Sequence, residues 1–457
     1  MGLFGGPLFT PFKAATALAR ARQGTACGRP HVAVFWLATE DHDFAEIDHV
    51  VFPARRELRK LTYAGAHTEA QPVGGILLDE TITPLIDQVW ELLGPSDAMD
   101  ALAAAYLPGR SFAQAFAEFY SKIFAAQGLL VLDAGGREFH RIGAPVLRAA
   151  IERADELHQA LLDRNVQLAA AGFHAQVAVV PLSSLLFLID APTGARVALK
   201  RHPASVHEPG GLWLAGKQSY STADLLGILD AAPERISPSA LLRPVFQDFL
   251  LSTSAIVGGP AEIAYFAQSA VLYERILGQN GTGRITPSLA RFSATLIEPA
   301  IAELMQRHEL SLERIFEVCG PESAVSLAQL LAARSMPLEG KQKLAAAGSA
   351  LDAELTPLVE WMLALDAGLG QSAETAAGKI RYQMGRLRTL AANFELQREA
   401  SLGRHAEAIS QALYPAGALQ ERLHGAACYF ARYGLELAEI LTAQAANGCP
   451  GHTACWL

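Results

Sequence analysis

Cysteine is scarce in this chain, with five residues in 457. That number is too small for the disulfide framework that small secreted domains use in place of a large core. Basic charge is also in short supply, because 37 Lys and Arg oppose 46 Asp and Glu and give a net charge of −9. A nucleic-acid-binding protein needs a basic surface to displace counterions, so we expect no nucleic-acid partner.

Long apolar runs are absent as well. The longest uncharged stretches, near 175–189 and 249–261, contain Pro181 and Pro260 and fall short of the about 18 apolar residues that span a bilayer. No basic segment precedes an apolar one in residues 1–22, so we expect no signal peptide. With hydrophobic residues at 51%, the composition predicts a cytoplasmic globular protein of roughly two to four domains with no membrane partner.

Short apolar runs alternate with amphipathic segments in much of the chain. Residues 32–38 (VAVFWLA) and 128–133 (GLLVLD) are typical of strands that are buried on both faces. A third apolar run, 248–257, ends at Gly258-Gly259-Pro260 and leads into an amphipathic helix over 261–277. Such strands separated by helices predict an α/β core with a parallel sheet.

The stretch 150–235 has a different pattern. A charged helix is expected over 146–171, followed by strands over 174–180, 185–190 and 196–200. The last two strands are separated by the turn sequence of residues 191–194, which predicts a β-hairpin. We therefore expect a small α/β insertion here.

Two heptad seams follow, separated by residues 368–370 (GLG). Their apolar positions alternate in spacing between three and four residues, which predicts a long antiparallel helical hairpin, kinked or started near Pro357. A two-helix arm has little surface to bury alone, so we expect a second copy to cover it. The seam residues are Leu351, Leu355, Leu358, Met362, Leu365 and Leu369, then Ala377, Ile380, Met384, Leu387, Ala391 and Phe394.

These patterns divide the chain into five segments. Residues 1–149 and 236–338 form the two parts of the sheet core, and 150–235 form the insertion. Residues 339–415 form the coiled-coil hairpin, and 416–457 form a helical segment that packs back on the core.

The strongest functional signal is Glu40-Asp41-His42-Asp43, which follows the first expected strand. Ligands bind beyond the carboxyl ends of parallel strands. Carboxylates placed there can hold an ammonium group, and a histidine can exchange a proton near neutral pH. A helix cap would explain Asp41 or Asp43, but not three acids and a histidine together.

A metal site is an alternative for the same stretch. His42, Glu46 and His49 would share one face of a helix, a ligand set that suits zinc. Their spacing is not that of HExxH and no second ligand cluster is evident, so we expect no metal. Cys449, His452 and Cys455 offer three soft ligands without a fourth, and we expect a frayed tail with exposed thiols there.

Two glycine turns and one arginine complete the candidates. Gly258-Gly259-Pro260 either lets a ligand approach the backbone or forms a tight turn. The turn at residues 5–7 (GGP), with Thr10 and Lys13 beyond it, could serve a phosphate, although it has no Walker pattern. Arg243, before the third expected strand, could clamp a carboxylate or form a surface ion pair.

Taken together, these strings resemble the BshC family of cysteine-adding enzymes in bacillithiol biosynthesis, over essentially the whole chain. The segments that carry the resemblance are GLFGGPLFTPFK (2–13), VFWLATEDHDFAEIDHV (34–50), GLLVLD (128–133), RPVFQDFLLSTSAIVGGPAEIAYFAQ (243–268) and QERLHGAACYFARYG (420–434). The resemblance implies a Rossmann-like core similar to class I aminoacyl-tRNA synthetases and nucleotidyl transferases. It also implies a connecting-peptide-like insertion and a coiled coil that forms a homodimer.

The resemblance further implies a ligase that joins L-cysteine through an amide bond to the amino group of glucosaminyl malate. On that interpretation the acids of residues 40–43 hold the amine or the cysteine ammonium, and His42 is the general base. ATP or ADP is the candidate cofactor. The predicted site residues are Glu40, Asp41, His42 and Asp43 for catalysis, Arg243, Gln247, Gly259, Glu262, Tyr265 and Arg291 for the substrate, and Gly6, Thr10 and Lys13 for the nucleotide.

One departure from the family concerns the N-terminus. In the family a Gly-Gly-Gln-Gln turn and a strand precede the GL-x-x-GPL-x-T string, whereas here Met1 falls inside that turn. Either the start is truncated or this member lacks the first strand, and a missing strand would leave an open sheet edge and half a phosphate loop. The synthetase HIGH and KMSKS signatures are absent too, so ATP activation is not implied. These departures favour, as second hypothesis, a catalytically silent dimeric scaffold that binds a nucleotide or metabolite. A metal-dependent hydrolase is the third.

Overall fold

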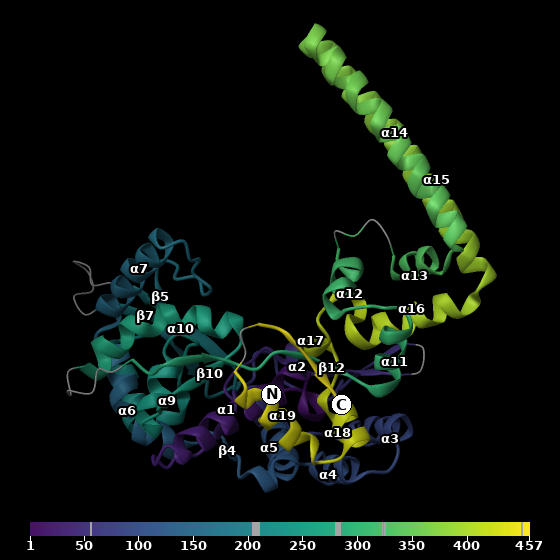
Figure 1. The fold of residues 1–457 in the computed structure, drawn as a ribbon. Helices are drawn as coiled ribbons and strands as arrows, with labels where there is room; N and C mark the ends of the chain where they lie inside the picture. Colours follow the sequence, from purple (N-terminus) through teal and green to yellow (C-terminus); the bar gives the residue numbers. More distant parts are fainter. Residues whose placement is uncertain (55–56, 203–210, 279–284, 322, 324–325, 449–450) are drawn as a thin grey trace. The chain divides into compact units, whose positions relative to one another are not determined.

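The computed structural model describes residues 1–54, 57–202, 211–278, 285–321, 323, 326–448 and 451–457 (Figure 1). The chain divides into two compact units. Unit 1 consists of Met1–Phe52, Arg59–Ser293 and Glu421–Thr453, and unit 2 consists of Pro53–Leu58, Ala294–Gln420 and Ala454–Leu457.

Two pairs of parallel strands lie in unit 1. Strand β1 (Val34–Trp36) pairs with β4 (Leu130–Leu132), and β10 (Ile256–Gly258) pairs with β11 (Ser288–Ala290). The strands predicted over 32–38 and 128–133 are therefore present, although each is only three residues long. Their parallel pairing places the residues that follow β1 and β4 at the same edge.

The third predicted strand is wrong over most of its length. Residues 248–251 end helix α9 (Arg243–Leu251), and only Ile256–Gly258 is extended. Pro244 suits the first turn of a helix, and Ser252, with a φ of 48°, ends it. Val245 and Phe246 are fully buried, so this apolar run packs as a helix face.

The insertion contains a five-stranded antiparallel sheet, in the order β8-β7-β6-β5-β9. The predicted hairpin is confirmed, since Leu188 of β5 pairs with Val197 of β6. The strand predicted over 174–180 is wrong. There the Val177 backbone bonds to the Gln268 side chain, 2.9 Å through its N–H and 3.0 Å through its carbonyl, instead of to a strand. The strands are β5 (Ser183–Ile189), β6 (Arg196–His202), β7 (Leu212–Ala215), β8 (Gln218–Tyr220) and β9 (Ile236–Pro238).

Helices surround these strands in unit 1. The charged helix predicted over 146–171 is two helices, α6 and α7, which meet at Arg153. The remaining elements are η1 (Leu3–Gly5), α1 (Phe9–Ala26), α2 (Phe44–Ile47), β2 (His49–Pro53), β3 (Leu58–Thr62), η2 (Val73–Gly75), α3 (Ile82–Leu93), α4 (Asp97–Ala105), α5 (Phe112–Ile123), η3 (Ala125–Gln127), α6 (Arg137–Glu152), α7 (Ala154–Ala170), α8 (Thr222–Ala231), η4 (Pro233–Arg235), α10 (Pro260–Leu272), η5 (Tyr273–Leu277), α17 (Gln420–Leu423), α18 (Ala426–Tyr433) and α19 (Leu437–Ala446).

Unit 2 is mainly helical. Its core gathers Ile315, Leu331, Ile409 and Leu413, all fully buried. The short strands β12 and β13 pair beside it. The elements are β12 (Ala294–Ile297), α11 (Pro299–Arg307), α12 (Leu312–Cys319), α13 (Leu327–Ser335), α14 (Leu338–Leu365), α15 (Ala367–Arg398), α16 (Ala400–Leu413), η7 (Pro415–Gly417) and β13 (Thr453–Trp456).

Helices α14 and α15 lie side by side and form a long arm, as predicted (Figure 1). The turn is at Asp366, whose carboxylate accepts a hydrogen bond from the Leu369 N–H at 2.9 Å and so caps α15. The expected start or kink at Pro357 is wrong as a start, because α14 begins at Leu338 and runs through Pro357. No helix among the described residues is both long and apolar enough to cross a membrane.

Candidate functional site

The predicted acidic loop lies where the parallel strands end. Residues 39–43 follow β1 and lead into α2, and Asp133 follows β4. The Thr39 hydroxyl donates to the Asp133 carboxylate at 2.5 Å, which ties the two strand ends together. On the other side, the Val73 N–H donates to the Asp41 carbonyl at 2.7 Å. The loop is therefore held from both sides.

Asp41 lies between two arginines. Nη1 of Arg243 donates to its Oδ2 at 3.1 Å, and Nη1 of Arg196 lies 3.5 Å from its Oδ1. Burial opposes ionisation, but the two guanidinium groups outweigh it and lower the pKa of Asp41. Arg243 therefore belongs to the site, although it begins helix α9 rather than preceding a strand as predicted.

Arg196 is a site residue that the sequence analysis missed. It comes from β6 of the insertion, is only 5% exposed, and stacks on Phe187 with 3.8 Å between guanidinium carbon and ring centre. Its Nε donates to the Ser237 hydroxyl and its Nη2 to the Pro238 carbonyl, both at 2.9 Å. The only local signal was an arginine that opens an expected strand, a common surface position.

The arginine also orients His42. Nη1 of Arg196 lies 3.3 Å from Nδ1 of His42. A guanidinium nitrogen can only donate, so Nδ1 accepts, and a neutral His42 then carries its proton on Nε2. In this arrangement His42 presents a hydrogen-bond donor rather than the free lone pair that the predicted general base requires.

Glu40 faces a second residue that the sequence analysis missed. His140, on α6, is fully buried, and its Nε2 lies 3.1 Å from Oε1 of Glu40. Its Nδ1 lies 3.0 Å from the Ile236 carbonyl oxygen. Glu40 thus contacts His140, and Asp41 contacts the two arginines. The third predicted acid, Asp43, is exposed.

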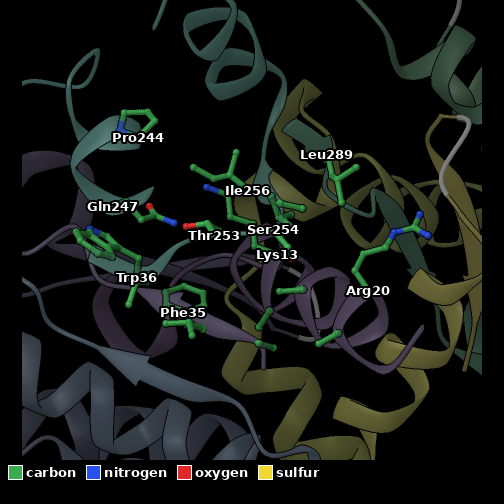
Figure 2. Close-up of a pocket in the computed structure, with 18 of the residues that line it drawn as sticks. Lys13, Arg20, Phe35, Trp36, Pro244, Gln247, Thr253, Ser254, Ile256 and Leu289 are labelled. Carbon is green, nitrogen blue, oxygen red and sulfur yellow. The ribbon is translucent and has the colours of Figure 1, made fainter. Parts of the chain in front are cut away.

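A cavity of about 740 Å³ lies between β1 and β10 (Figure 2). Among the described strands, β1 pairs with β4 and β10 pairs with β11. Figure 2 shows Phe35 and Trp36 from β1 together with Ile256 of β10 in its walls. Five of the six predicted site residues that line the cavity are Thr10, Lys13, Arg243, Gln247 and Tyr265.

Glu262 also lines the cavity, and it is held by two partners. Its carboxylate forms an ion pair with Lys13 and accepts a hydrogen bond from the Gly259 N–H at 2.8 Å. Burial favours the neutral acid, but Lys13 and the Gly259 N–H outweigh it and lower the pKa of Glu262. Burial raises the pKa of Tyr265 nearby to about 12, so its phenol is a hydrogen-bond donor at neutral pH.

The turn predicted to hold a nucleotide phosphate is buried. The Gly6 N–H donates to the Leu3 carbonyl at 3.0 Å, and Thr10 is only 4% exposed. Lys13 is already neutralised by Glu262. A phosphate needs free N–H groups and uncompensated cations, so Gly6, Thr10 and Lys13 do not fit one in this conformation.

Arg291 is held away from the cavity by a buried ion pair. Its Nη2 and Nη1 lie 2.6 and 2.9 Å from the two carboxylate oxygens of Glu421, and the two side chains are 5% and 2% exposed. Its backbone N–H donates to the Gly258 carbonyl at 2.9 Å, behind Gly259. Arg291 therefore stabilises the fold in this structure and does not face the cavity where we expect the substrate.

The alternative metal ligands are not gathered. Within the part of the chain that the structure describes, no three His, Cys, Asp or Glu side chains are arranged to hold a metal ion, and His49 instead contacts Asp48. Cys449 lies outside the described residues. The expectation of a frayed tail is wrong for residues 453–456, which form β13 and bury Cys455, raising the pKa of its thiol to about 11.

Two family models match the chain. The model of the N-terminal Rossmann-like domain of bacillithiol biosynthesis BshC matches residues 1–278, and the model of its C-terminal coiled-coil domain matches residues 294–455. The chain belongs to the BshC family. Both the predicted family and the predicted fold class, a Rossmann-like core with a coiled-coil domain, are confirmed.

Curated BshC relatives cover nearly all of the chain, and each carries the name "Putative cysteine ligase BshC". The relative from Koribacter versatilis is 42% identical over 99% of this chain and 81% of its own length. Those from Solibacter usitatus and Geobacillus thermodenitrificans are 35% and 29% identical, over 96% and 97% of this chain and 79% and 80% of their own lengths. These names agree with the predicted ligase class, while the residue roles and segment limits stay predictions.

Proposed function

We propose that this chain joins L-cysteine through an amide bond to the amino group of glucosaminyl malate, which produces bacillithiol. One observation carries the proposal: in a BshC-family chain, a polar cluster gathers at the end of β1. Carboxylates, arginines and a histidine meet there, and forming an amide by ligation requires groups that bind an amine, a carboxylate and the charge that develops between them.

We assign the amine to Asp43. Glu40 and Asp41 face His140 and the two arginines, whereas Asp43 is exposed and borders a hollow of about 430 Å³ that His42 also lines. An ammonium group must lose a proton before its nitrogen can attack, and the Asp43 carboxylate can accept that proton. His42 would donate its Nε2–H to a carboxyl oxygen of L-cysteine and so orient that group beside the amine.

The malate carboxylates are assigned to Arg243. It uses Nη1 for Asp41, but a guanidinium has five N–H donors, and the side chain lines the large cavity. Gln247 and Tyr265 line the same cavity and supply uncharged donors. This set would distinguish a dicarboxylate-bearing sugar from an unmodified one.

The proposal is tested by mass spectrometry of the condensed thiol. The full chain is mixed with L-cysteine and glucosaminyl malate, and D43N is compared with D87N, which removes an exposed acid on α3. Product from the wild type and D87N, with a large loss in D43N, would support the assignment. No product from folded wild-type protein would favour the silent dimeric scaffold instead.

The same assay, run with and without ATP and magnesium, decides whether a nucleotide takes part. The turn predicted to hold it does not fit phosphate, so we assign no step to ATP. Product formed only with ATP would mean that another part of the chain binds the nucleotide.

The arm is the basis for a second proposal, that two copies of the chain associate through α14 and α15. Several large apolar side chains on the arm are exposed, which is unusual for a surface helix. Sedimentation of the full chain tests this, since a dimer has twice the 48.8 kDa of one chain. The exposed residues are Leu338, Leu358, Trp361, Leu363, Leu365, Leu369, Ile380, Tyr382, Leu387, Leu390 and Phe394.

A further inference from the structure

The His140 ring has an oxygen atom beside each of its two nitrogens, a carbonyl at Nδ1 and a carboxylate at Nε2. Nδ1 lies 3.0 Å from the Ile236 carbonyl oxygen and Nε2 lies 3.1 Å from Oε1 of Glu40. A neutral imidazole carries one N–H, so one of its lone pairs would point at an acceptor. The imidazolium, with an N–H on each nitrogen, donates a hydrogen bond to the Ile236 carbonyl and forms an ion pair with the Glu40 carboxylate.

Glu40 is the charged partner of the ring among the described residues, and the other groups beside it are an aromatic ring and a carbonyl. Helix α9 presents the Phe246 ring, with 5.4 Å between ring centres, and η4 presents the Pro233 carbonyl. The charged residues nearest along α6 have their own partners at the surface. Those pairs are Arg137 with Glu234 and Arg141 with Glu138.

We propose that His140 is a positioning residue for the amide-forming reaction, a buried imidazolium that fixes the Glu40 carboxylate at the end of β1. One oxygen of Glu40 is held by His140, and the other is left to accept a hydrogen bond from a substrate hydroxyl. This inference rests on the proposed function, because it assigns a role within that reaction.

The contact between His140 and Glu40 should weaken as the pH rises. Burial disfavours the imidazolium, but Glu40 and the carbonyls of Ile236 and Pro233 outweigh it and raise the pKa of His140. The contact is therefore complete below the usual histidine value of 6.5 and is lost as the pH rises through the raised value. Above it, the neutral ring no longer holds Glu40.

The protonation state can be measured without any activity. In the full chain labelled with ¹⁵N-histidine, we expect one imidazolium signal that persists at pH 7 and is absent from H140Q. We expect E40Q to convert that signal to a neutral ring at the same pH. A neutral ring at position 140 at pH 7 in the wild type would overturn the proposal.

Activity then tests the positioning role. A misplaced group costs about a hundredfold in rate for a 1 Å displacement, and we expect a kcat/KM loss of that order in H140A. H140Q keeps an uncharged donor near the Nε2 position, so it should recover much of the loss and flatten the fall in rate at alkaline pH. H158Q is the matched control, because His158 also contacts a carbonyl, that of Ser183, and forms no ion pair with a carboxylate of the described residues.

The outcomes separate the two proposals. If the wild type makes no product, the proposed function fails, while the NMR titration still tests the Glu40 contact. If the wild type is active and H140Q and H140A lose the same activity at every pH, His140 has only a structural role and the inference fails.

Discussion

Fully buried aromatic rings fill unit 1, among them Phe12, Phe116 and Trp213, whereas Trp361, Tyr382 and Phe394 on the arm of unit 2 are 59%, 67% and 62% exposed. Both regions have regular apolar patterns in the sequence. The pattern identifies which side chains share a face, and the tertiary structure decides whether the same chain covers that face. The uncovered face is where we expect a second copy.

Charged groups differ between the two regions in the same way. In unit 1, Asp41 and Glu421 are matched by arginines in buried or half-buried contacts. On the arm, pairs such as Lys343 with Glu339 lie at the surface, at 75% and 77% exposure. Removing one partner of a buried pair leaves an uncompensated charge and lowers the free energy of unfolding strongly. Removing one partner of an exposed pair changes it little, because water already screens both charges.

The largest expected effect follows from that difference. Glu421→Ala leaves Arg291 as an uncompensated buried charge, and we expect a loss of about 3–5 kcal/mol in the free energy of unfolding. Glu339→Gln, the matched change on the arm, should have no measurable effect. Denaturant unfolding of both variants would contradict the comparison if the losses were equal.

The second prediction concerns the exposed arm. Leu365→Glu places a charge on the apolar face, so self-association should weaken by about 2 kcal/mol per copy, the value of one buried leucine. Sedimentation would measure the dissociation, and circular dichroism should show an unchanged helix content. Thr356→Glu, which adds the same charge at an exposed polar position, should leave association unchanged. If both variants stay dimeric, this face is not the interface.

Helix caps should not distinguish the two units. Ser111 caps α5 in unit 1 and Ser326 caps α13 in unit 2, and each accepts a hydrogen bond at 3.2 Å from the backbone N–H three residues on. Changing either serine to alanine should lower the free energy of unfolding by about 1 kcal/mol, because the hydrogen bond that is lost lies within one helix turn. Unequal losses in denaturant unfolding would show that the surrounding unit, not the cap, sets the cost.

The smallest expected effect is a pH dependence of unit 2, opposite in sign to that of the His140 contact. Nε2 of His308 lies 2.9 Å from Nδ1 of His405, so at least one ring is neutral. Burial is the largest cause of a lowered pKa at both histidines, and Arg307 adds to it at each. His405 and Arg334 further lower the pKa of His308, Arg404 further lowers that of His405, and Glu399 opposes both shifts.

The folded chain therefore binds fewer protons at this pair than the unfolded chain as the pH falls from about 6.5. Stability should decrease over that range, and His405→Gln should flatten the decrease. Thermal unfolding between pH 5 and 7 measures it, with His158→Gln as control. A decrease of the same slope in His405→Gln would rule out the pair as its source.

The sequence predicted the parts of the fold that depend on neighbouring residues. Continuous apolar runs located β1 and β4, and the heptad spacing located the arm. The run that became α9 was misread, because a short apolar run has no periodicity that separates a buried strand from a buried helix. Pro244 in its first turn was the overlooked signal.

The candidate site was predicted only in part for a related reason. The acidic loop was placed correctly at the carboxyl end of β1, since that follows from the order of the elements. Arg196 and His140 were missed because they come from other segments, with 155 residues between Asp41 and Arg196. Contacts of that kind are set by how the insertion and α6 pack, which local patterns do not encode.

The length of α14 has a mechanical consequence. Its 28 residues make a rod about 42 Å long, and it joins the rest of unit 2 at one end. A rotation of roughly 10° at that base would carry the tip through about 7 Å, as a lever does. A distance probe attached beside Asp366, at the far end, would therefore magnify small rearrangements around His308 and His405 into displacements that are easily measured.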